Sequence, residues 1–140
     1  MAYQVEVKYF NSFVLRKVVD ATVATNQDGS WPGLPWVPKF IEKLQSTNNV
    51  GYAAGYSNND CIPTQFLFHR NHIVLFGWVF PPQIKNWFCD NFIYNLYGKE
   101  FGHWLKEYNH FNVGGEPRYT PNNDERLCEM LVKRHRPQIK

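Results

Sequence analysis

Apolar and polar residues alternate near the amino-terminal end of the chain. Val5, Val7 and Tyr9 are separated by polar residues, and residues 13–19 are rich in branched and apolar side chains. A hydrophobic period of two residues is typical of a strand. Residues 1–20 are therefore predicted to form an extended segment.

Helical periodicity occurs in three later segments. Apolar residues recur every three or four positions over residues 36–44 and again over residues 86–97, where Gly98 is expected to end the helix. Asn122 and Glu125 resemble a capping box that opens a third helix. These spacings predict three helices, each with one apolar face.

The segments between these helices mix short strands and turns. Residues 49–55 are small and apolar without alternation, which predicts a strand buried on both faces. Residues 63–68 are expected to be extended, and residues 69–76 to form a short helix that ends at Gly77. This mixture of strands and helices predicts an α/β layer architecture.

Length and composition favour one domain. The chain has 140 residues, 44% of them hydrophobic, which suffices for one compact core over residues 1–140. The formal net charge is only +3, and the basic residues at 132–140 are typical of a solvated tail. Other protein subunits are therefore better candidate partners than nucleic acid.

Cysteine usage and hydropathy bear on the compartment. Cys61, Cys89 and Cys128 are odd in number and widely spaced, which predicts unpaired thiols in a reducing, intracellular compartment. Residues 1–10 include charged side chains and do not resemble a cleaved leader. The longest apolar stretch, residues 73–82, is much shorter than the about 20 residues that span a bilayer, so no membrane span is expected.

Three motifs follow one another in residues 49–100: an Asn-Val-Gly strand, a His-Arg-x-His helix and a Trp-x-x-Asp helix. Their order resembles that in a group of GT-A-type glycosyltransferases. Weaker similarities extend the resemblance to residues 20–140. It implies a partial GT-A-like fold: a Rossmann-like mixed sheet with flanking helices that represents the acceptor-side, carboxyl-terminal half. Only 25 residues precede Asn26, so we expect the amino-terminal nucleotide-binding half to be missing.

The resemblance also implies a metal position. The Asn-Gln-Asp turn at residues 26–28 is similar to the family's Asn-Asp-Asp turn, whose carboxylates help to hold Mg²⁺ or Mn²⁺ against the diphosphate of a nucleotide sugar. Gln27 replaces one acid, so Asp28 is the remaining candidate metal ligand. A neutral amide is a weaker ligand for a hard cation, and we therefore expect no cofactor.

A second acidic pair is also degenerate. Asp90 matches the first acid of the family's acceptor helix and is the candidate catalytic base, whereas Asn91 replaces the second acid. Asn91 retains hydrogen-bonding capacity but cannot accept a proton at neutral pH. The same resemblance gives Arg70, Trp87 and Asn91 as acceptor-binding residues.

Two sets of residues have a structural interpretation that competes with a functional one. His69 and His72 have a spacing that suits a metal pair, yet no nearby carboxylate or cysteine completes a ligand set. The aromatic residues Trp78, Phe80, Trp87, Tyr94 and Trp104 suit either a sugar-stacking platform or the core, and core packing is favoured.

These observations predict a degenerate, non-catalytic glycosyltransferase-like domain that serves as a structural or accessory subunit. The alternative is the acceptor-side half of an active, metal-dependent nucleotide-sugar transferase. A lesser alternative is an accessory subunit of mitochondrial respiratory complex I, because the short His110-Phe-Asn-Val113 segment and the Gly-x-Pro-x-Tyr-x-Pro segment at residues 115–121 are similar to motifs in such a subunit. An organellar, for example mitochondrial, location fits that reading.

Overall fold

The computed structural model describes residues 5–10, 13–18, 36–57, 59–85, 87–109 and 124–139, with the backbone alone for residues 5–18, 36 and 37. Within these ranges the architecture is mixed α/β. The elements follow one another in the order β1 (Val5–Phe10), β2 (Phe13–Val18), α1 (Trp36–Ser46), β3 (Tyr52–Tyr56), β4 (Phe66–His69), α2 (Asn71–Phe76), α3 (Cys89–Phe101), β5 (Gly102–Asn109), α4 (Glu125–His135) and the 3₁₀ turn η1 (Arg136–Gln138).

The described strands form one mixed sheet in the order β1-β2-β4-β3-β5. β1 and β2 are an antiparallel pair in which Val5 lies opposite Val18 and Phe10 lies opposite Phe13. β4 pairs antiparallel with both β2 and β3, whereas β3 and β5 are parallel. The extended structure predicted for residues 1–20 is confirmed for the two ranges that the structure describes there.

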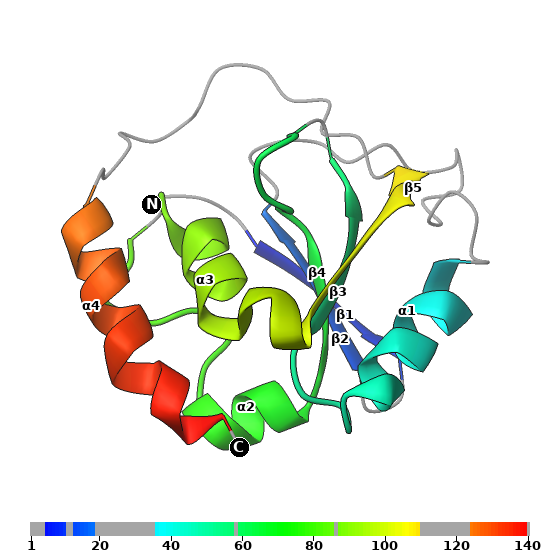
Figure 1. Cartoon of the computed structure of the whole chain (residues 1–140), viewed down its shortest axis with the longest axis horizontal. Helices are drawn as coiled ribbons and strands as arrows, with labels where there is room; N and C mark the ends of the chain where they lie inside the picture. Colours follow the sequence, from blue (N-terminus) through cyan, green and yellow to red (C-terminus); the bar gives the residue numbers. More distant parts are fainter. Residues whose placement is uncertain are drawn as a thin grey trace.

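Helices cover both faces of the central strands. Figure 1 shows α1 on one side of the sheet and α3 and α4 on the other. Ala53 and Leu67 pack with α1, against Phe40 and Leu44. Their strand neighbours point to the opposite face and join the cores of α2, α3 and α4; these are Tyr52, Ala54, Phe66 and Phe68. Because both faces of β3 are buried, the strand shows no alternation, as predicted, although it begins at Tyr52 and not at residue 49.

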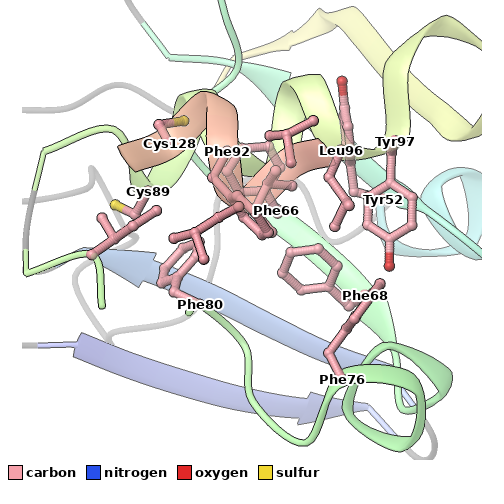
Figure 2. Packing of buried hydrophobic residues seen from close by; sticks show 14 of the residues in the cluster. Tyr52, Phe66, Phe68, Phe76, Phe80, Cys89, Phe92, Leu96, Tyr97 and Cys128 are labelled. Atoms are coloured by element: carbon pink, nitrogen blue, oxygen red, sulfur yellow. The ribbon is translucent and has the colours of Figure 1, made fainter. Parts of the chain in front are cut away.

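Aromatic rings fill the core between the sheet and helices α2, α3 and α4 (Figure 2). The rings of Tyr52 and Phe66 meet edge to face with centroids 5.0 Å apart, and Phe66 stacks on Phe68 at 5.8 Å. Phe92 from α3 and Leu131 from α4 are fully buried in the same cluster. Such offset and edge-to-face contacts add specificity to the hydrophobic burial that stabilises this side of the sheet.

The ends of the first two helices agree with the sequence predictions. α1 covers the predicted residues 36–44 and continues to Ser46. α2 ends at Phe76, where Gly77 adopts a left-handed φ of 78° and its amide donates to the Ile73 carbonyl. Both helices therefore begin and end within two residues of the predicted positions.

The prediction for the next segment was wrong in two respects. α3 begins at Cys89 and not at residue 86, and Gly98 does not end it. Gly98 leaves helical geometry at φ 59° and ψ −160°, but a further turn continues to Phe101 before β5 begins. β5 was not predicted, because most of its residues are only partly buried and the strand therefore lacks a strong apolar alternation.

The amino-terminal cap of α4 also differs from the prediction. The helix begins at Glu125, and its cap is Asp124, whose Oδ1 accepts a hydrogen bond from the Leu127 amide at 3.0 Å. The expected cap, Asn122, lies outside the described residues. The Asp124 carboxylate, two residues after Asn122, satisfies an amide of the first turn that has no intrahelical partner. The cap and the helix therefore begin later than the sequence predicted.

Hydropathy gives the same answer in the structure as in the sequence. No helix in the described ranges is both long and apolar enough to cross a membrane.

A close backbone contact joins the start of β3 to the junction of α3 and β5. Gly51 has φ 112°, and a Cβ atom at this position would lie 1.8 Å from the carbonyl oxygen of Phe101. Gly102 makes a similar approach, because its Cβ would lie 2.6 Å from both the Gly98 carbonyl oxygen and the Tyr52 hydroxyl. The parallel pairing of β3 and β5 begins at this contact, with Tyr52 opposite Gly102.

We expect Gly51→Ala to destabilise the protein by about 3 kcal/mol or more, because it combines a disfavoured φ with a backbone clash. Gly77→Ala is the matched control: it has a similar positive φ, yet its Cβ would meet nothing within 4 Å. That control should lose only about 1 kcal/mol. Urea denaturation followed by circular dichroism measures both, and equal losses would show that the contact with Phe101 contributes nothing beyond the strained φ.

Candidate functional site

The first turn of α3 carries two of the predicted site residues, Asp90 and Asn91. The residue before the helix, Phe88, has φ 71° and makes no side-chain cap. The amides at the beginning of such a helix lack intrahelical partners and create a positive potential. Asp90 is therefore placed where its anionic form is stabilised.

Asp90 is half-buried and lies beside a thiol. The Sγ atom of Cys89, which is 4% exposed, lies 3.9 Å from Oδ1 of Asp90. Asn91 follows on the same turn and is also half-buried. The arrangement supplies one carboxylate and one amide that hydrogen-bond polar groups, and only the carboxylate is able to take up a proton.

Trp87 differs from the other aromatic residues proposed for a stacking platform. Its side chain is 44% exposed, directly before α3. Phe80 is buried, and Trp78 packs in the core, with its ring centroid 5.2 Å from Phe76. Core packing is therefore confirmed for Trp78 and Phe80, whereas Trp87 is partly exposed at the same end of α3 as Asp90.

The structure does not bring Arg70 to this end of α3. Arg70 is exposed at the amino-terminal end of α2. Helix α2 is tied to Tyr97 of α3 by a hydrogen bond from His72, and Tyr97 lies seven residues, or about 10 Å along the helix axis, beyond Asp90. The guanidinium makes no ion pair or hydrogen bond with the side chains that the structure describes.

The predicted metal position cannot be placed. Asp28 and Gln27 lie outside the described residues. Within the described residues, no group of three or more His, Cys, Asp or Glu side chains is arranged to hold a metal ion. Metal binding by Asp28 remains a prediction of the resemblance.

The two histidines proposed as a metal pair have separate partners. The Nδ1 atom of His69 accepts a hydrogen bond from the Asn71 amide at 3.1 Å. His72 is buried between Tyr97 Oη, 2.6 Å from Nδ1, and the Val79 carbonyl, 2.9 Å from Nε2. Because a carbonyl only accepts, Nε2 carries the proton of His72, and Tyr97 donates to Nδ1.

This buried pair was not predicted from the sequence. Burial raises the pKa of Tyr97 and so keeps its hydroxyl protonated as a donor. The ring of His72 also stacks on Phe68 at 4.4 Å. A His and a Tyr separated by 25 residues give no local signal, so the interaction becomes visible only when α2 and α3 pack together.

All three cysteines are free thiols, as predicted. Cys61 is exposed, whereas Cys89 and Cys128 are buried. Burial, together with the nearby Glu129 and Glu125, raises the pKa of Cys128 to about 11. This thiol therefore stays protonated and unreactive at neutral pH.

Comparisons of the chain with protein-family models, curated proteins and solved structures found no match.

Replacing Tyr97 with Phe should destabilise the protein by about 1–3 kcal/mol, because it leaves the buried Nδ1 of His72 without its donor. Tyr94→Phe on the same helix is the matched control, since its hydroxyl has no hydrogen-bond partner among the described residues. Thermal unfolding of both variants measures the difference. A Tyr97→Phe variant as stable as the control would contradict the assigned hydrogen bond.

Stability should fall as the pH falls below the ordinary histidine pKa of 6.5. Burial first, and then the charge of Lys43, lowers the pKa of His103, whose Nε2 lies 3.1 Å from Thr47 Oγ1. The unfolded chain then binds the proton more readily than the folded chain, so protonation favours unfolding below that pH. We expect a smaller loss of Tm between about pH 7.5 and 5.5 for His103→Gln than for the wild type; equal losses would exclude His103 as a contributor.

Proposed function

We propose that this chain is a degenerate glycosyltransferase-like domain without catalytic activity of its own and that it serves as an accessory subunit of a larger assembly. The observation that carries the proposal is the first turn of α3, where the carboxylate of Asp90 is followed by the amide of Asn91. The enzymes that the sequence resembles have two acids there. Loss of one acid removes a proton acceptor but leaves hydrogen bonding intact.

The arrangement of elements supports the glycosyltransferase-like part of the proposal. A buried central strand, β3, follows the Asn-Val-Gly motif, and α2 follows His69 and Arg70. α3 then begins just after Trp87. This order agrees with the one that the resemblance implies, within a mixed sheet flanked by helices.

Exposed apolar side chains support the accessory part of the proposal. Val74 is 77% exposed on α2, and Met130 is 49% exposed on α4. Trp87, at 44%, adds a large aromatic surface before α3. Aromatic side chains and methionine are enriched where one protein contacts another, so other protein subunits are the expected partners.

One observation favours the alternative, an acceptor-side half of an active metal-dependent transferase. Asp90 lies at a helix beginning that stabilises its anionic form, and the partly exposed Trp87 precedes it. A carboxylate beside an exposed aromatic ring suits a sugar hydroxyl and the apolar face of a pyranose. In this alternative Asp90 is the base and the nucleotide sugar is bound with Mn²⁺ or Mg²⁺.

A donor-cleavage assay separates the two proposals. The purified chain is incubated with UDP-glucose or GDP-mannose, Mn²⁺ and mixed oligosaccharides, and the released UDP or GDP is measured. We expect no release above the rate of Asp90→Asn, because Asn91 stands where the enzymes that the sequence resembles have a second acid. Migration of the chain with larger proteins in a native extract is expected as the second readout.

Two results would contradict the proposed function. Nucleotide release that Asp90→Asn lowers by about 100-fold or more, and that Asp60→Asn leaves unchanged, would overturn the non-catalytic proposal and support a base at Asp90. Asp60 is an exposed carboxylate outside α3 and controls for loss of charge. Migration of the native chain as a monomer would overturn the accessory role.

A further inference from the structure

A hollow of about 550 Å³ lies between the second half of α3 and the end of α4. Its size falls within the about 300–1,000 Å³ typical of sites for small molecules. It is separate from the first turn of α3, because every α3 residue that lines it comes from position 94 onward. The lining residues are Tyr94, Asn95, Gly98, Lys99, Glu129, Val132, Lys133 and Arg136.

The kink in α3 shapes one wall of this hollow. Gly98 has φ 59° and ψ −160°, so the helix departs from regular geometry at this point. A Cβ atom at Gly98 would lie 3.0 Å from Nη2 of Arg136, which places the guanidinium against the glycine backbone. The absence of a side chain at residue 98 therefore allows Arg136 to approach α3.

Positive charge predominates among the lining residues. Lys99, Lys133 and Arg136 contribute three positive charges and Glu129 one negative charge, so the formal sum is 3 − 1 = +2. None of the three cations forms an ion pair with the described side chains. Neighbouring cations that outnumber the one carboxylate of the hollow repel one another, and a bound anion relieves that repulsion.

The helix dipoles account for the positions of Lys99 and Lys133 one at a time. They do not explain why these two lysines and Arg136 line the same hollow. Lys99 is in the last turn of α3, and Lys133 is in the last turn of α4, where positive charge is favourable. His135, also in the last turn of α4, points elsewhere and packs against Trp78, with ring centroids 5.1 Å apart. The hollow thus receives Lys133 and Arg136 from one segment and Lys99 from another.

We propose that this hollow binds a phosphate group, free or carried by a small organic molecule. Arg136 has the planar fork that matches two phosphate oxygens, and Lys99 and Lys133 supply point charges from opposite walls. Asn95 offers an amide for hydrogen bonding, and Tyr94 offers a ring and a hydroxyl to the remainder of the ligand. A hollow of this size between α3 and the end of α4 suits a compact phosphate better than an extended nucleic acid. The proposal is independent of the glycosyltransferase-like function.

Isothermal titration calorimetry with the full chain tests this proposal. Inorganic pyrophosphate and glycerol phosphate are titrated separately at about 0.15 M ionic strength. We expect saturable binding, and at least about tenfold weaker binding in both Arg136→Gln and Lys99→Gln. Tighter binding of glycerol phosphate supports an organic ligand, and tighter or equal binding of pyrophosphate supports a free phosphate source.

Arg134→Gln is the matched control, because it removes the same charge two residues before Arg136, at an exposed residue outside the hollow. Its affinity for either probe should stay within about twofold of the wild type. No binding of either probe up to about 10 mM would overturn the proposal. Equal weakening by Arg134→Gln and Arg136→Gln would also overturn it, because the attraction would then reflect the overall positive charge of α4. Circular dichroism of each variant verifies that it is folded.

Discussion

The contact between Gly51 and the Phe101 carbonyl fixes the arrangement of the central elements. It brings the start of β3 within van der Waals distance of the turn between α3 and β5. Any side chain at residue 51 would occupy the position of that carbonyl oxygen. Because β3 and β5 pair in parallel from this point, the direction in which α3 crosses the sheet follows from it.

The orientation of α3 then separates two regions of different chemistry. Its first turn holds Asp90 and Asn91 at the positive end of the helix dipole. Its second half, from residue 94 to residue 99, forms one wall of a hollow with net positive charge. Between them, Phe92, Ile93 and Leu96 are buried against the aromatic core, which anchors the middle of the helix.

The sequence predicted the local elements well and their interactions less well. The buried run at residues 49–55 and the helix that ends at Gly77 agree with the structure because period and turn chemistry act over a few residues. β5 was missed because only Leu105 is buried along it. At the candidate site, Asp90, Asn91 and Trp87 were found through neighbouring positions in one motif, whereas Arg70 was grouped with them although α2 places it elsewhere.

The amino-acid sequence by itself determined the α/β character, the apolar helix faces, the unpaired thiols and the single carboxylate in the first turn of α3. Only the tertiary structure decided that His72 meets Tyr97, that Gly51 meets Phe101, and that Lys99 faces the basic residues of α4. The physical reason is the distance along the chain over which each kind of interaction acts. Hydrophobic period, capping and turn preference act between residues a few positions apart, whereas these contacts join distant segments and exist only after helices pack on the sheet.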